Sequence, residues 1–86
     1  MTEDTTLSLY QYDACPYCAR VRSALDRLNV SIEMRDTLED PSRLAELIEA
    51  TGRRTVPVLR LEASGGEVTW LPESADIVRY LEERFG

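Results

Sequence analysis

The chain has 86 residues, 43% of them hydrophobic, which suffices for one small core and predicts a single domain over residues 1–86. It contains no histidine, so imidazole-based acid–base catalysis, cysteine–histidine nucleophiles and histidine zinc sites are excluded. Sixteen acidic residues against ten basic ones give a net charge of -6, which argues against a nucleic-acid partner.

The sequence shows no export signal and no apolar run of membrane-spanning length, so we expect a cytoplasmic protein without a membrane partner. Two cysteines are too few for a four-thiolate zinc or iron–sulfur site within one chain, and we expect no metal. We also expect a monomer.

Hydrophobic periodicity predicts three elements in the first half of the chain. Residues 7–12 alternate as a strand does. Apolar residues then recur at helical spacing from Pro16, and Asn29 is a plausible left-handed stop about three to four turns later. Val30 to Asp36 alternates again, which predicts a second strand.

The second half predicts four more elements. Asp40 and Pro41 begin a helix that Gly52 ends. Residues 56–61 and 67–71 form an antiparallel hairpin, and a helix follows from Ser74 to Phe85. The order βαβ, α, ββα predicts an α/β fold with a four-stranded mixed sheet and three helices.

The motif Cys15-Pro16-Tyr17-Cys18 stands directly after the first strand and opens the first helix. A helix N-terminus carries unpaired N–H groups and the positive end of the macrodipole, which favour a thiolate at Cys15. Cys18 is one turn further on the same side and can attack a mixed disulfide formed at Cys15. The alternatives are a structural disulfide or half a zinc site, but the loop is short and no second such motif exists. The motif therefore indicates redox chemistry.

Leu9-Tyr10, the motif at residues 15–18 and Thr55-Val56-Pro57 together resemble the glutaredoxin family over almost the whole chain. The resemblance implies a thioredoxin-like fold and a glutathione-dependent thiol–disulfide oxidoreductase. Its partners would be glutathione and disulfide-containing or glutathionylated proteins. In this family Cys15 would be the catalytic nucleophile and Cys18 the catalytic resolving thiol.

The same resemblance implies that Pro57 is a cis-proline opposite the cysteines. The Val56 backbone would pair with the cysteinyl part of glutathione. From the residues alone, a trans proline at the start of a strand is the ordinary case.

Glu73-Ser74, followed by Ile77 and Tyr80-Leu81, is similar to the N-terminal domain of glutathione S-transferases. There the Glu-Ser pair holds the γ-glutamyl end of glutathione, and a helix N-terminus suits its carboxylate. The alternative is that Ser74 is simply an N-cap with Asp76 in the first turn.

Tyr12 stands where glutaredoxins commonly carry a lysine for the glycine carboxylate of glutathione. Arg53 and Arg54 could supply this charge, or they form a solvated loop pair. A γ-glutamyl thiol that lacks the terminal glycine would also fit a site without this lysine. The expected thiol-binding residues are Tyr17, Arg54, Thr55, Val56, Pro57, Glu73 and Ser74.

Two rival functions share the same residues. One is a glutathione-binding module of the glutathione S-transferase N-terminal type, which conjugation of a model aryl halide would reveal. The other is an iron–sulfur carrier, in which two chains each offer Cys15 and two glutathiones complete the ligand set. A brown protein after anaerobic reconstitution would indicate the carrier.

Overall fold

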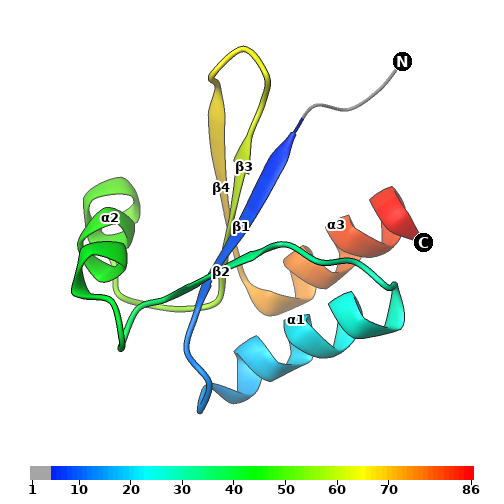
Figure 1. Cartoon of the computed structure of the whole chain (residues 1–86), viewed down its shortest axis with the longest axis horizontal. Helices are drawn as coiled ribbons and strands as arrows, with labels where there is room; N and C mark the ends of the chain where they lie inside the picture. The colour runs from blue at the N-terminus through cyan, green and yellow to red at the C-terminus, as the bar shows by residue number, and fades with distance from the viewer. Residues whose placement is uncertain (1–4) are drawn as a thin grey trace.

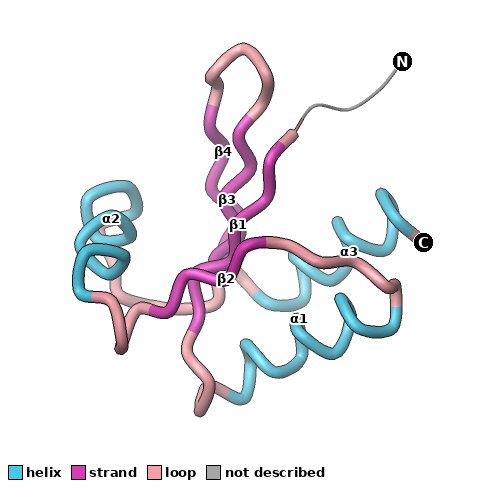
Figure 2. The backbone as a smooth tube through the Cα atoms, in the orientation of Figure 1, coloured by secondary structure: helices cyan, strands magenta, loops and turns pink. Residues whose placement is uncertain are grey.

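The computed structural model describes residues 5–86, so the first four residues of the expected domain lie outside it. The elements in chain order are β1 (Thr6–Gln11), α1 (Pro16–Arg27), β2 (Glu33–Asp36), α2 (Pro41–Thr51), β3 (Val58–Glu62), β4 (Val68–Pro72) and α3 (Ser74–Phe85). This order is the one predicted from the sequence (Figures 1 and 2).

The strands form one mixed sheet in the order β2-β1-β3-β4. β1 runs parallel to β2, because α1 connects them by a crossover, and antiparallel to β3. β3 and β4 form the predicted antiparallel hairpin. The arrangement is a thioredoxin-like α/β fold, as expected.

The helices cover both faces of the sheet: α1 and α3 lie together on one face and α2 lies alone on the other (Figure 1). Two hydrophobic clusters follow from this layering. The larger contains seven buried residues, Leu7, Leu9, Val21, Leu25, Leu59, Ile77 and Leu81. The smaller, on the α2 face, contains Tyr10, Leu47 and Val58. Because β1 is covered on both faces, its polar residues Ser8 and Gln11, which lie on opposite faces, are buried too.

Local signals set most helix ends as predicted. Asp40 accepts a hydrogen bond from the Ser42 N–H and caps α2, and Gly52 ends this helix at φ 75°. Asn29 follows the end of α1 at φ 60°. No helix within residues 5–86 is both long and apolar enough to cross a bilayer.

Three strands begin later than predicted, β4 by one residue at Val68 and the other two by more. β2 begins at Glu33 instead of Val30, because only the last residues of this segment lie opposite β1. Val30 and Ile32 still pack against the larger cluster, but Met34 on the edge strand is 41% exposed. β3 begins at Val58 instead of Val56, since the ladder with β1 ends there and Pro57 has no N–H to donate.

Candidate active site

Cys15 occupies the N-cap of α1, between β1 and the first helical residue Pro16. Its sulfur accepts a hydrogen bond from the Cys18 N–H at 3.2 Å, as a capping oxygen does at other helix starts. The residue is 4% exposed, and its Sγ lies 4.0 Å from the Val56 carbonyl oxygen. The fold thus places this sulfur at the positive end of a helix, against a segment distant in the sequence.

Cys18 lies one turn further along α1 and is 0% exposed. Burial raises the pKa of its thiol to about 12, and the hydrogen bond with Cys15 adds to the rise. A backbone hydrogen bond from Tyr12 and the charge of Arg22 oppose it in part. Both cysteines are free thiols. A capping sulfur next to a buried, protonated second thiol is the asymmetry that an attacking and a resolving thiol require.

The Val56-Pro57 peptide bond is cis, as the resemblance to glutaredoxins implied. The trans form expected from residue frequencies alone is therefore wrong. Pro57 is buried, and the carbonyl of Val56 is the group that meets Cys15.

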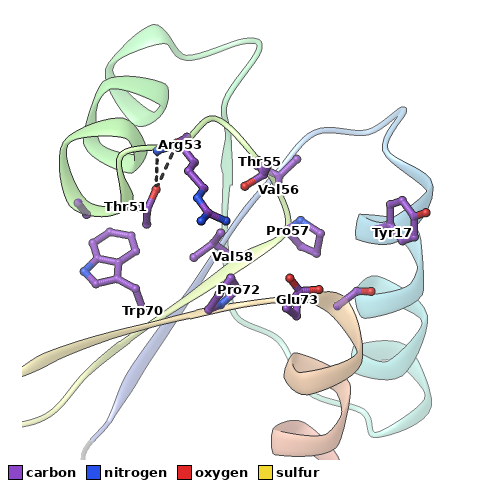
Figure 3. Close-up of a pocket in the computed structure, with 12 residues that line it drawn as sticks. Tyr17, Thr51, Arg53, Thr55, Val56, Pro57, Val58, Trp70, Pro72 and Glu73 are labelled. Carbon is purple, nitrogen blue, oxygen red and sulfur yellow. Dashed lines mark hydrogen bonds between the residues drawn. The ribbon is translucent and has the colours of Figure 1, made fainter.

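A cavity of about 690 Å³ opens beside the cysteine motif (Figure 3). α1, the end of α2, the segment entering β3, the end of β4 and the start of α3 all contribute to its wall. It brings together six of the seven expected thiol-binding residues, namely Tyr17, Thr55, Val56, Pro57, Glu73 and Ser74.

Arg54, the seventh, is not among the residues that line this cavity; its neighbour Arg53 is. The Arg53 side chain points into the cavity in Figure 3, and its N–H donates to the Thr51 hydroxyl at 3.2 Å. Both arginines lie in the irregular segment between α2 and β3, and of the two only Arg53 is turned toward the cavity. Tyr12 does not line it either.

Glu73, not Ser74, is the N-cap of α3, so the alternative in which Ser74 is simply an N-cap is wrong. Glu73 has φ 75° and ψ 114°, and its side chain makes no capping hydrogen bond. Ser74 is the first helical residue and is 8% exposed. The first-turn amides of α3 therefore have no side-chain cap from Glu73, next to a cavity that both residues line.

Sequence reasoning missed several wall residues: Ala50 and Thr51 at the end of α2, and Val58, Trp70 and Pro72 on the strands. For Trp70 a signal existed, because Leu71 packs on the larger cluster and period-two alternation turns Trp70 to the opposite face. No comparable signal marks Ala50 or Thr51. Within residues 5–86, no group of three or more cysteine or carboxylate side chains is placed to hold a metal ion.

A cysteine pair at the start of the first helix, opposite a cis-proline on a four-stranded mixed sheet, defines a thioredoxin-fold dithiol protein. Comparison with known proteins narrows this class. Residues 9–86 match the model of the family described as "Glutathione S-transferase, N-terminal domain".

Glutaredoxin 2 of Escherichia coli K12 is 33% identical over 84 residues, which cover 93% of this chain and 34% of the relative. The crystal structure of glutaredoxin 2 from Salmonella typhimurium in complex with glutathione has a TM-score of 0.72 at 30% identity, over 94% of this chain and 34% of that one. The crystal structure of maleylacetoacetate isomerase from Anaeromyxobacter dehalogenans 2CP-1, with bound GSH in the active site, has a TM-score of 0.71 at 31% identity. The match covers 98% of this chain and 39% of that one.

The chain belongs to the glutathione S-transferase N-terminal-domain family, and glutaredoxin 2 is among its relatives. It spans about a third of the length of this curated relative.

Proposed function

We propose that this chain binds glutathione in the cavity and reduces glutathione mixed disulfides or protein disulfides through Cys15. The observation that carries the proposal is the position of the Cys15 sulfur: it caps α1 and lies against the Val56 carbonyl, where the cavity wall begins. The relatives support it, since glutaredoxin 2 of the same fold was solved with glutathione.

Glutathione would lie along the cavity with its cysteinyl part on the Val56 backbone. The uncapped amides at the start of α3 would receive the γ-glutamyl carboxylate, and Glu73 its amino group. Arg53, at the α2 end of the cavity, would take the glycine carboxylate. Tyr17, 60% exposed at the mouth, would contact the tripeptide from the α1 side.

The reaction consists of two thiol–disulfide exchanges. The Cys15 thiolate attacks the glutathione sulfur of a mixed disulfide, and the protein or small-molecule thiol leaves and takes a proton. Cys15 then carries glutathione. Cys18 can attack the Cys15 sulfur, which forms the Cys15–Cys18 disulfide and releases glutathione. Alternatively, a second glutathione attacks the bound glutathione sulfur, which frees the Cys15 thiolate and releases oxidised glutathione. We propose a reducing, cytoplasmic compartment for this reaction, because disulfides do not persist there.

Single cysteine variants test the proposal. C15S removes the nucleophile and should abolish turnover of a glutathione mixed disulfide, measured by coupling to NADPH through glutathione reductase. C18S should keep this turnover, because a second glutathione can replace Cys18, but should lose reduction of a protein disulfide. Equal loss of both activities in both variants would contradict the assigned roles.

Conjugation of glutathione to an electrophile is a second candidate, which the family match favours. The same cavity residues would bind the thiol, and Cys18 would have no part in the reaction. Turnover of a model aryl halide that survives in C18S and exceeds mixed-disulfide turnover would put conjugation first.

A further inference from the structure

Arg22 ties α1 to the loop that leads into the cysteine motif, and the proposed function leaves it without a role. It lies one turn after Cys18 and is half-buried. Its guanidinium donates to the side-chain oxygen of Gln11, to the Asp13 carbonyl at 3.1 Å and to the Tyr12 carbonyl at 3.5 Å. One side chain therefore holds the last residue of β1 and the first two residues of the loop that leads to α1.

The backbone of Tyr12, inside this loop, is hydrogen-bonded to Cys15. Its carbonyl accepts a hydrogen bond from the Cys15 N–H at 3.2 Å. A backbone hydrogen bond from Tyr12 lowers the pKa of Cys18, and so does the positive charge of Arg22, although burial has the larger, opposite effect. Arg22 thus holds the Tyr12 backbone that is hydrogen-bonded to Cys15, and its charge favours the Cys18 thiolate.

We infer that Arg22 is a positioning residue for the step in which Cys18 resolves the mixed disulfide on Cys15. The inference rests on the proposed function and deepens it, because this step is the one that reduction of protein disulfides requires. Arg22 would therefore equip the chain for protein disulfides as a substrate class, in addition to glutathione mixed disulfides.

The step is balanced without an external oxidant. The Cys18 thiol gives its proton to solvent and its sulfur bonds to the Cys15 sulfur. The bond between Cys15 and the glutathione sulfur breaks, and the glutathione thiolate leaves and takes up a proton. One disulfide is consumed and one is formed.

The requirement for a cation follows from burial. Cys18 is 0% exposed, so its thiolate develops away from water, where an unpaired charge is costly. Cys15 lies one turn before Cys18 and Arg22 one turn after it, and both side chains influence the pKa of the Cys18 thiol. In the mixed disulfide Cys15 carries no charge, which leaves Arg22 as the charged group among these two.

The test follows both steps in one experiment. Reduced protein is mixed with oxidised glutathione and quenched with acid at intervals, and mass spectrometry counts the mixed disulfide. Its formation reports the Cys15 step and its decay reports the Cys18 step. R22M removes the charge and the hydrogen bonds, R22K keeps the charge, and R20M alters an exposed arginine of the same helix as a matched control.

We expect R22M to slow the decay about tenfold more than the formation, and to shift the pH profile of the decay upward by about one unit. R22K should restore most of the profile, and R20M should match the unaltered protein. Equal slowing of both steps, or slower decay with an unshifted profile, would overturn the inference. Should R22M fail to fold by circular dichroism, R22Q against R22K makes the same comparison. If no mixed disulfide forms on the unaltered protein, the proposed function fails and takes the inference with it.

Discussion

At the scale of single residues, the site depends on which of two adjacent arginines faces the cavity. Arg53 lines it and Arg54 does not, although both are exposed. Nothing in the sequence around Gly52 distinguishes them, because the choice depends on the direction in which the chain leaves the left-handed turn at φ 75°. The sequence could therefore predict the pair of arginines from which the proposed carboxylate ligand comes, but not which of the two faces the cavity.

This placement makes R53Q and R54Q a matched pair. R53Q should raise the KM for a glutathione mixed disulfide about tenfold, since it removes a charge-assisted hydrogen bond of roughly 1.5 kcal/mol. R54Q should change it by less than about twofold, as for a solvated charge. With glutathione esterified at its glycine carboxylate, the difference between the variants should vanish. Equal effects of R53Q and R54Q on the unmodified thiol would contradict the placement.

At the scale of elements, the sequence predicted those boundaries whose signals are local. Pro16, Asp40-Pro41 and Gly52 act on their own backbone, and the helices they delimit are found as expected. The start of β2 depends on where β1 remains free to pair, so Val30 could not be excluded from the strand by its own pattern. The cap of α3 is likewise set by how the chain turns out of β4, which a Ser at the helix start does not reveal.

Glu73, at the start of α3, has a strained backbone conformation and also lines the cavity. Glu73 adopts φ 75° and ψ 114°, a region that costs a residue with a side chain of order 1 kcal/mol or more. E73G should therefore raise the free energy of unfolding by about 1 kcal/mol, measured by urea denaturation. The same change should lower mixed-disulfide turnover, because it removes the carboxylate from the cavity wall.

N29G is the control for this prediction. Asn29 also has a positive φ, 60°, but it lies in the αL region that Asn tolerates, at the end of α1 remote from the cavity wall. N29G should change stability by less than about 0.5 kcal/mol and leave turnover unaltered. A destabilised E73G protein would show that the Glu73 side chain contributes more to the fold than its backbone conformation costs.

At the scale of the whole molecule, the two faces of the sheet are unequally filled. Seven buried residues join α1 and α3 to one face, whereas Leu47 is the buried residue that joins α2 to Tyr10 and Val58 on the other. Polar contacts supplement this small cluster: the Tyr10 hydroxyl donates to Glu46 at 2.8 Å and accepts from Arg35 at 2.7 Å.

These polar contacts alter the pKa values of the Tyr10 hydroxyl and the Glu46 carboxyl. Burial raises the pKa of Tyr10, although its hydrogen bond with Arg35 opposes the rise. Burial pushes the pKa of Glu46 upward, but hydrogen bonds from Tyr10 and Arg43 outweigh it and lower the pKa overall. A lowered carboxyl pKa contributes stability that is present above the unfolded-state pKa and is lost as pH falls through the folded-state value. The attachment of α2 therefore weakens in acid.

The unequal layers predict that α2 opens before the rest of the fold. In hydrogen exchange at neutral pH, the backbone amides of α2 should exchange faster than those of α1, because fewer buried apolar side chains hold α2 to the sheet.

α2 also supplies Ala50 and Thr51 to the cavity wall, with Arg53 just beyond its end. A ligand that contacts both this wall and α3 stabilises the state in which α2 is packed on the sheet. C18S protein carrying glutathione on Cys15 should accordingly show slower exchange in α2 than C18S protein without it, while α1 away from the motif serves as the internal reference. Exchange in α2 as slow as in α1, or unaltered when glutathione is attached, would mean that this wall of the site is as rigid as the core.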